Sequence, residues 1–376
     1  MQANTFPLIE MEGTPFEMGY QHGSQAKDMI AHGIEMFHRT IVEDPWELLP
    51  GVDTKMSFEE IVNMASQSLP YTEEHAPDIV EEMRGIAEGS GFTLEEIFAM
   101  NCDGDIWITL FPLAGEAALA HNSCSTYAVG SAGTADGGTY VGWNADTMEW
   151  FDTSSVILKG KPNDGLPFLC WNYAGVVGRP GVNPHLGLGA NGIWPYENTP
   201  GLPYAVMCRK ILQQKSVADA IAVIQNTQLM CGMNYTLGDE EGNVAAVEGT
   251  STQTAVVRGT NGKVVHSNHI VADELVHQDA LYSPELSGQE LLRNSRSRRD
   301  RLTELLVDAE AGSITLEDLK AAHADHANSP DSVCSHVGGG EGDAITLASM
   351  IAQPGRSKLL VTRGNPCENE FVEYTL

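Results

Sequence analysis

The strongest constraint on the fold is a change in sequence pattern near residue 124. Before it, apolar residues recur at helical spacing, whereas after it short runs of β-branched and aromatic residues are separated by glycine. With 376 residues and 42% hydrophobic side chains, the chain can bury a large core in one or two domains. The pattern therefore predicts a mostly helical segment followed by a β-rich one.

Three capping signatures predict where helices begin in the first segment. Thr14 precedes Pro15 and is followed three residues later by Glu17, and the same Ser/Thr-x-x-Glu pattern occurs at residues 57–60 and 93–96. An apolar stripe with steps of three and four predicts a helix after the first cap, through Ala26, Ile30, Ile34, Phe37 and Ile41. Residues 111–122 lose this period and predict an exposed connector.

The second segment alternates strands with helices. Strands are expected at 124–130, 140–144, 155–159 and 168–173, and again within 234–269, with hairpin turns at residues 136–138 and 261–262. Helices are expected at 203–227, 288–308 and 315–327, before a closing strand pair that turns at residues 354–355. This order favours a layered α+β sandwich over a doubly wound parallel sheet.

Charge and hydropathy restrict the partners. The chain has 51 acidic and 21 basic side chains, a formal charge of −30, which disfavours binding to nucleic acids or anionic lipids. No apolar stretch approaches the roughly 18 residues that span a bilayer, and the first residues lack a signal-peptide pattern. We expect a soluble, cytoplasmic protein without membrane or nucleic-acid partners. The acid-rich surface is also compatible with a saline habitat.

Seven cysteines are widely spaced, with no Cys-x-x-Cys pair. This spacing predicts neither a disulfide framework nor a thiolate zinc site, and the odd number leaves at least one free thiol.

Cys124 lies where the connector meets the first expected strand. A lone strand cysteine is usually an inert apolar residue, but a chain cut before Cys124 would place the thiol beside its own α-amine, a suitable general base. The expected hairpin turn brings Cys124 opposite residues 146–149. Asp146 could then hold the amine or simply end its strand.

The chain resembles the acyl-coenzyme A:6-aminopenicillanic acid acyltransferases, which are cysteine N-terminal nucleophile hydrolases. The resemblance extends over nearly the whole chain. It is carried by residues 13–23 (GTPFEMGYQHG), 123–126 (SCST), 142–146 (GWNAD), 174–178 (AGVVG), 189–193 (GANGI), 265–269 (VHSNH), 331–334 (DSVC) and 363–367 (RGNPC).

This resemblance implies an αββα sandwich, made as a precursor that cleaves itself between Ser123 and Cys124. The products, residues 1–123 and the catalytic residues 124–376, would stay associated. It implies Cys124 as nucleophile, Asp146 as partner of its amine and Asn268 as an oxyanion-hole residue together with backbone N–H groups. The residues implied to bind substrate or oxyanion are Ser125, Asn144 and Arg298. No cofactor or metal is expected.

The chain departs from the family pattern at two places. Ser123 stands where the best-known relative has glycine, and Ser335-His336 follows Cys334 where many relatives have arginine. Arginines also crowd one expected helix, at positions 293, 296, 298, 299 and 301. They could recognise a carboxylate or phosphate, but we favour pairing with the many acidic side chains.

The leading hypothesis is an amide hydrolase or acyltransferase that acts on small N-acyl amines, N-acyl amino acids or β-lactam-like amides through a thioester on Cys124. The high negative charge favours water over coenzyme A chemistry. One alternative is a metal-dependent hydrolase using the histidine and acid cluster of residues 323–336, which includes His323, Asp325, His326 and Asp331. Another is a non-catalytic binding protein. The Gly-x-Gly-x-x-Gly run at 187–192 lacks a βαβ context, and no Gly-x-Ser-x-Gly motif occurs.

Overall fold

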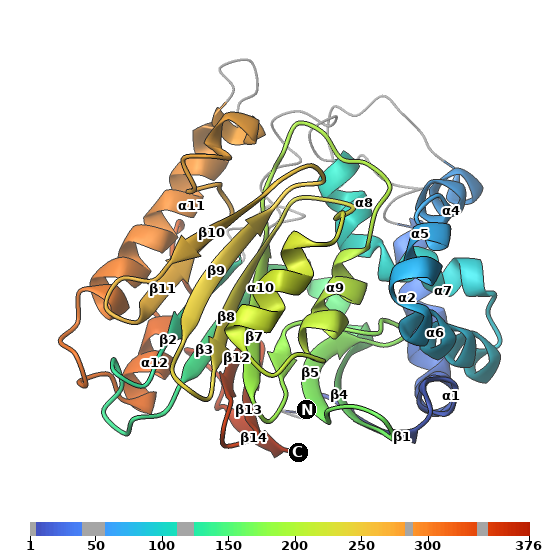
Figure 1. The fold of residues 1–376 in the computed structure, drawn as a ribbon, viewed down its shortest axis with the longest axis horizontal. Helices are drawn as coiled ribbons and strands as arrows, with labels where there is room; N and C mark the ends of the chain where they lie inside the picture. Colours follow the sequence, from blue (N-terminus) through green and yellow to red (C-terminus); the bar gives the residue numbers. More distant parts are fainter. Residues whose placement is uncertain (1–4, 40–56, 111–123, 283–288, 337–344) are drawn as a thin grey trace.

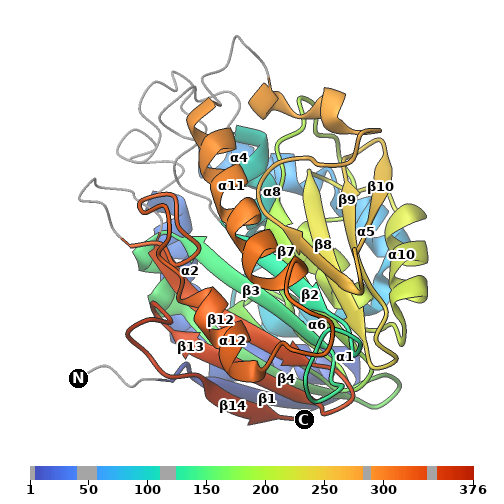
Figure 2. The same cartoon turned by 90° about the vertical axis from the view of Figure 1, so that its left-hand side faces the viewer.

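Two β-sheets lie face to face and helices cover both outer faces (Figures 1 and 2). The computed structural model describes residues 5–39, 57–110, 124–282, 289–336 and 345–376. Within these residues, sheet A has the strand order β1-β4-β5-β6-β7-β8-β9-β10 and sheet B the order β11-β2-β3-β12-β13-β14. The expected layered α+β sandwich is confirmed as an αββα arrangement.

Sheet A is antiparallel except at one edge, where β1 pairs in parallel with β4. Its strands are β1 (Leu8–Gly13), β4 (Ser155–Pro162), β5 (Phe168–Tyr173), β6 (Gly181–Val182), β7 (Leu186–Gly192), β8 (Met233–Asp239), β9 (Val244–Gly249) and β10 (Thr254–Arg258). The short run before the first helix was not predicted as a strand. Its alternation of exposed and buried residues is that of a strand, but the strand forms by pairing with β4, which is distant in the sequence.

Sheet B is antiparallel throughout its described pairs. Its strands are β2 (Ser125–Val129), β3 (Tyr140–Thr147), β11 (Lys263–His266), β12 (Ile345–Gln353), β13 (Lys358–Arg363) and β14 (Val372–Thr375). β2 and β3 contact β7 and β8 across the space between the sheets. The main apolar core fills that space and continues between sheet A and the helices that pack on it. Strands such as β2 and β5 are therefore buried along their whole length.

Helices α11 (Gln289–Leu302) and α12 (Leu316–His323) cover sheet B, and α9 (Tyr204–Ile211) and α10 (Val217–Gln225) belong to the layer on sheet A (Figure 2). A π-helical turn, Thr303–Val307, extends α11. A second apolar cluster lies beneath α11 and α12. The outer layers thus shield both sheets from water.

The N-terminal helices lie beside sheet A (Figure 1). They are α1 (Pro15–Gln25), α2 (Lys27–His38), α4 (Phe58–Ser66), α5 (Leu69–His75), α6 (Pro77–Ser90), α7 (Leu94–Asn101) and α8 (Asp103–Leu110). Helix α1 lies against the β1–β4 edge, and α8 lies next to α9. All three predicted capping boxes are present, at Thr14, Ser57 and Thr93. The expected stripe helix corresponds to α2, and its last member, Ile41, lies outside the described residues, as does the predicted connector 111–122.

Glycines allow α1 and α6 to approach closely. A Cβ on Gly19 would lie 1.9 Å from the carbonyl oxygen of Glu82, and one on Gly85 would lie 2.2 Å from that of Phe16. Any side chain there would push the helices apart. Gly19, which belongs to the first family-like motif, therefore serves helix packing.

The predicted turns have different outcomes. The turn at residues 136–138 joins β2 to β3 as an antiparallel hairpin, as predicted. Asn261 and Gly262 form a tight turn with φ values of 52° and 72°. However, the predicted hairpin is wrong, because β10 pairs within sheet A and β11 within sheet B. Their divergence links the two sheets at this edge.

None of the helices in the described ranges is both long and apolar enough to cross a membrane.

Candidate active site

Cys124 is the first described residue before β2, and its side chain lines a pocket between the sheets. The thiol is half-buried, and its Sγ lies 3.9 Å from the carbonyl oxygen of Asp146. Burial, together with the nearby charge of Asp146, raises the pKa of Cys124 to about 11. The thiol of the continuous chain is therefore neutral at neutral pH and needs a base to become nucleophilic. Ser123, on the other side of the expected cleavage, lies outside the described residues.

The register of the β2–β3 hairpin differs slightly from the prediction. Ser125 pairs with Asn144, so Cys124 falls opposite Ala145 rather than opposite residues 146–149. Side chains alternate between the faces of a strand, so Ser125 and Asn144 face the helices on sheet B while Cys124 and Trp143 face the pocket. Asp146 is still adjacent to Cys124, through its backbone.

Asp146 is fully buried on β3. Its Oδ1 accepts a hydrogen bond of 2.7 Å from Oγ1 of Thr346 on β12. The pairing of β3 with β12 is irregular between Thr346 and Ala348, where one strand bulges. The bulge and the Thr346 hydroxyl together fix the carboxylate beside the start of β2.

Arg298 connects three of the predicted site residues. This buried side chain reaches from α11, and its Nη1 donates to the carbonyl oxygen of Cys124 at 2.5 Å and to Oγ of Ser125 at 3.0 Å. Its Nη2 donates to Oδ1 of Asn268 at 3.0 Å, and Nε donates to Oδ1 of Asn294. Burial lowers the pKa of Arg298 to about 10, so it remains a cation at neutral pH.

We predicted that the clustered arginines of α11 pair with acidic side chains. This prediction is correct for some members of the cluster and wrong for Arg298. Arg293 bonds to Asp331 at 2.9 Å, and Arg301 bonds to Asp325 and Glu304. The hydrogen bonds of Arg298 instead go to neutral oxygens. Arg298 is buried where α11 packs against β2, whereas the side chains of Arg293 and Arg301 are 61% and 22% exposed and can reach acidic side chains.

The orientation of Asn268 follows from its partners. Because arginine only donates, the amide oxygen of Asn268 must face Arg298, and its Nδ2 then donates to the carbonyl oxygen of Gly192 at 3.0 Å. Gly192 lines the pocket. The amide donor of Asn268 is thus directed toward a residue of the pocket wall.

Asn144 does not face the pocket. Its Nδ2 donates to the carbonyl oxygens of His323 and Val333, and its Oδ1 accepts from Oγ of Ser349 and from the ring of His323. Every bonding position of this amide is used on the α12 side of sheet B. We therefore assign Asn144 to the support of β3 rather than to substrate contact.

The 323–331 cluster is dispersed among other partners. His323 is buried between Tyr127 and Asn144, and burial lowers its pKa to about 3. Asp325 and Asp331 bond to arginines of α11. Of the four residues proposed as a metal cluster, His326 alone lies in a different group of side chains, described below. These contacts occupy His323, Asp325 and Asp331, which therefore do not form a common metal site.

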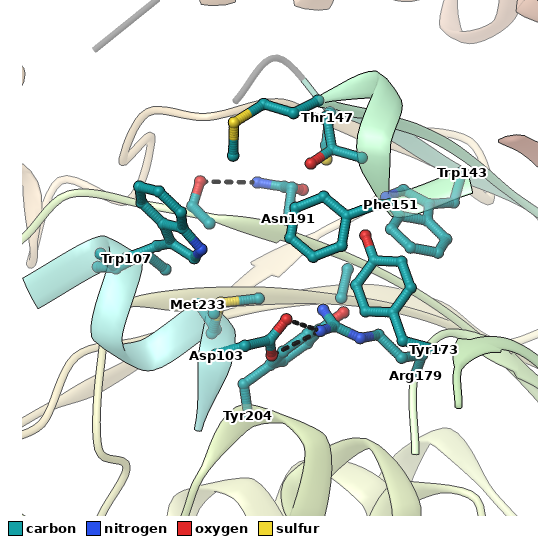
Figure 3. Close-up of a pocket in the computed structure, with 16 residues that line it drawn as sticks. Asp103, Trp107, Trp143, Thr147, Phe151, Tyr173, Arg179, Asn191, Tyr204 and Met233 are labelled. Atoms are coloured by element: carbon teal, nitrogen blue, oxygen red, sulfur yellow. Dashed lines mark hydrogen bonds and ion pairs between the residues drawn. The ribbon is translucent and has the colours of Figure 1, made fainter. Parts of the chain in front are cut away.

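Sequence reasoning missed the residues that shape the pocket (Figure 3). Its lining is rich in aromatic rings, those of Trp107, Trp143, Phe151, Tyr173 and Tyr204. Arg179 lies over the rings of Tyr173 and Tyr204 at 4.6 and 5.1 Å and pairs with Asp103 at 2.5 Å. These side chains come from α8, β3, the 3-10 helix Glu149–Ser154, β5, the segment between β5 and β6, and α9, so no local sequence pattern could have revealed the pocket.

Asn191 also lines the pocket and was seen only as part of a rejected motif. Its Oδ1 accepts from Thr126 and Asn234, and its Nδ2 donates to the carbonyl oxygen of Ser267 at 2.5 Å. The ring of His266 lies beside it and bonds to Glu248 at 2.7 Å. This buried network fixes the pocket wall opposite Trp107.

A family model and one known relative name the same family. The family model described as "Acyl-coenzyme A:6-aminopenicillanic acid acyl-transferase" matches residues 134–368. The chain is 25% identical over 368 residues to the acyl-coenzyme A:6-aminopenicillanic-acid-acyltransferase 40 kDa form of Emericella nidulans, covering 95% of this chain and 92% of that protein. It is 24% identical over 267 residues to protein dcd1B of Dictyostelium discoideum, covering 65% of this chain and 50% of that protein.

Two solved structures are similar at a low level. A mutant of the conjugated bile acid hydrolase from Clostridium perfringens matches with a TM-score of 0.39 and 14% identity over 67% of this chain and 97% of that chain. Penicillin V acylase from Agrobacterium tumefaciens matches with a TM-score of 0.38 and 13% identity over 64% of this chain and 82% of that chain.

Proposed function

Because the chain belongs to the acyl-coenzyme A:6-aminopenicillanic acid acyl-transferase family, we propose that it is an amide hydrolase or acyltransferase whose nucleophile is Cys124. The observation that carries the proposal is the position of Cys124. Its Sγ lines an aromatic pocket, while Arg298 holds the backbone of Cys124 and the side chain of Asn268 together. The thiol thus lines the cavity, and the amide of Asn268 donates to Gly192 in the cavity wall.

The acyl transfer takes two steps. The thiolate of Cys124 attacks the carbonyl carbon of an N-acyl substrate, and the oxyanion that forms accepts hydrogen bonds from Asn268 and backbone N–H groups. The C–N bond breaks as the amine leaves with a proton from the α-ammonium group of Cys124, which leaves a thioester. Water then attacks the thioester carbonyl and regenerates the thiol. An amine in place of water makes the protein a transferase.

This chemistry requires the α-amine of Cys124 to be free. With a thiol pKa of about 11, little thiolate exists at neutral pH in the continuous chain. An α-amine has a pKa of about 7.7 to 8.0 and would lie within reach of the thiol that it deprotonates. We therefore propose that the thiol of Cys124 attacks the carbonyl of Ser123, that the peptide nitrogen leaves as the new α-amine, and that water hydrolyses the resulting thioester. Asp146 would orient that amine.

The pocket supports acyl groups with apolar bodies. Five aromatic rings surround the cavity, and the Asp103–Arg179 pair adds one polar feature to its wall. Small N-acyl amines, N-acyl amino acids and β-lactam-like amides fit this description. The formal charge of −30 makes the polyanionic coenzyme A an unfavourable donor, so we favour hydrolysis.

The proposal is tested by amine release from N-acyl amino acids and N-acyl β-lactam amides that differ only in acyl size. We expect the wild-type protein to favour aromatic or medium aliphatic acyl groups and Cys124→Ala to be inactive. Cys170→Ala, which removes a buried thiol outside the pocket lining, should retain activity. Full activity in Cys124→Ala would refute the proposal, and a wild-type chain that binds the amides without cleaving them would favour a binding protein.

A further inference from the structure

Four metal-ligating side chains meet at the edge of sheet B, outside the pocket. They are His326, Cys334, His336 and Cys367, and their ligand atoms all lie within 4.8 Å of one another. Cys334 is buried, and the other three are exposed. They come from the segment after α12 and from the connection between β13 and β14, which are far apart in the sequence. The fold alone brings them together.

Four of the six distances between ligand atoms are close to those of a tetrahedral metal site, and the other two, from His326 to the two sulfurs, are within 4.8 Å. The Sγ atoms of Cys334 and Cys367 are 3.7 Å apart, and Nε2 of His336 lies 3.7 Å from the first and 3.3 Å from the second. Nε2 of His326 lies 3.0 Å from Nε2 of His336. A zinc ion with usual bond lengths separates its ligands by about 3.8 Å for two sulfurs, about 3.6 Å for sulfur and nitrogen and about 3.3 Å for two nitrogens.

We propose that His326, Cys334, His336 and Cys367 bind one Zn²⁺ ion in a Cys₂His₂ site. Binding would release the two thiol protons, and two thiolates with two neutral imidazoles neutralise the charge of the ion. All four positions are filled by protein, so no position remains for water, and the role is structural rather than catalytic. This site replaces the sequence-based expectation that no metal binds and that the cysteines form no thiolate site.

The surroundings of the four ligands resemble those of a supported metal site. Nδ2 of Asn365 lies 3.5 Å from Sγ of Cys334 and can donate to a thiolate, and the backbone N–H of Cys334 donates to the carbonyl oxygen of Asp325. Such outer contacts orient ligands and lower the charge on sulfur. The exposed imidazoles leave a path for the ion from solvent.

The site would also steady the pocket indirectly. Ser335 stands between two ligands, and its N–H donates to Oγ1 of Thr346 at 2.8 Å, which in turn donates to Asp146. The carbonyl oxygen of Ser335 accepts from Nδ2 of Asn365 at 2.6 Å. The ion would therefore join the segment that contains Ser335, which bonds to Thr346 beside Asp146, to the β13–β14 connection.

Metal binding is tested on the full-length Cys124→Ala chain, so that neither reactivity nor cleavage at Cys124 affects the result. The reduced protein is stripped with a chelator, titrated with Co²⁺ and then with Zn²⁺, and its metal content is measured by mass spectrometry. We expect one ion per chain, thiolate-to-cobalt charge-transfer bands with the visible bands of tetrahedral cobalt, and their loss when Zn²⁺ displaces Co²⁺.

Ligand variants distinguish this site from adventitious binding. His336→Gln and Cys367→Ser change exposed side chains and should each weaken Zn²⁺ binding by about 100-fold, since one of four bonds is lost. His277→Gln, an exposed histidine of a 3-10 turn, is the matched control and should bind as before. The proposal is overturned if the reduced chain binds no stoichiometric metal, if both ligand variants bind normally, or if the protein purified under reducing conditions contains a Cys334–Cys367 disulfide and no zinc.

Discussion

Arg298 donates a hydrogen bond from Nη2 to Oδ1 of Asn268 over 3.0 Å. This contact settles which way the Asn268 amide points, because a guanidinium group has no acceptor. The same guanidinium group binds the carbonyl oxygen of Cys124, so one side chain from α11 sets the relative position of the proposed nucleophile and the proposed oxyanion donor. Catalysis should be sensitive to the shape of Arg298 as well as to its charge.

Arg298→Lys should lower kcat by about 100-fold, because an ammonium group cannot reproduce the planar fork that joins Cys124, Ser125 and Asn268. Arg293→Lys is the control on the same helix. It alters an exposed pair with Asp331, so stability should change little and kcat should not change. Equal effects of the two variants would contradict the positioning role of Arg298.

Asn268→Ala should lower kcat by about 100- to 1000-fold with little change in KM, since an oxyanion donor acts on the transition state. Steady-state kinetics on the preferred amide measure the split. An effect confined to KM would assign Asn268 to substrate binding instead.

Asp146→Asn should move the acidic limb of the pH–rate profile to lower pH. The carboxylate favours the protonated α-amine and, by repulsion, raises the pKa of the Cys124 thiol. Removing its charge lowers both pKa values, so the free amine and the thiolate form at lower pH, although poorer orientation lowers the maximal rate. An unaltered profile would count against the role of Asp146.

Thr346→Val should reduce activity, because it removes the hydrogen bond to Asp146 and the acceptor for the N–H of Ser335. Thr362→Val is a matched control, since Thr362 is also a buried threonine of sheet B that accepts from a backbone N–H, that of Ser349. Both variants should lose about 1 to 2 kcal/mol of stability. Only Thr346→Val should lower kcat, and parallel losses would make the Asp146 contact irrelevant.

His22 should make the fold sensitive to acid. Burial lowers its pKa to about 4, while its Nε2 accepts from the N–H of Gly175. The unfolded histidine titrates near 6.5, so the unfolded state binds the proton first and stability falls as pH decreases from about 6.5 to about 4, by up to about 3 kcal/mol. The free energy of unfolding is measured by chemical denaturation at several pH values in this range. It should depend less steeply on pH in His22→Gln than in the exposed control His277→Gln. The same pH dependence of the free energy of unfolding in both variants would show that His22 does not cause the acid sensitivity.

Local signals in the sequence predicted much of the fold. The caps at Thr14, Ser57 and Thr93 and the β2–β3 turn depend on residues within a few positions of one another, and each is present. The turn at Asn261 was predicted correctly, but the sheets to which its flanking strands belong were not, since strand pairing is decided by distant partners. β1 was missed for the same reason.

The same difference between local signals and contacts with distant residues applies to the candidate site. The resemblance supplied Cys124, Asp146, Asn268 and Arg298, and the structure brings these four together. It could not supply the direction in which Asn144 points, because this depends on the strand face and on α12. The aromatic lining and the His/Cys cluster each assemble from separate segments, so their members looked unrelated along the chain.

The intact mass of the freshly purified protein under denaturing conditions tests the central claim most directly. The account predicts two fragments, residues 1–123 and 124–376, from the wild-type chain and a single chain of 40.5 kDa from Cys124→Ala. A wild-type chain that stays uncut at 40.5 kDa and still releases amines would contradict the account. Cys124 would then act without the α-amine that the mechanism requires.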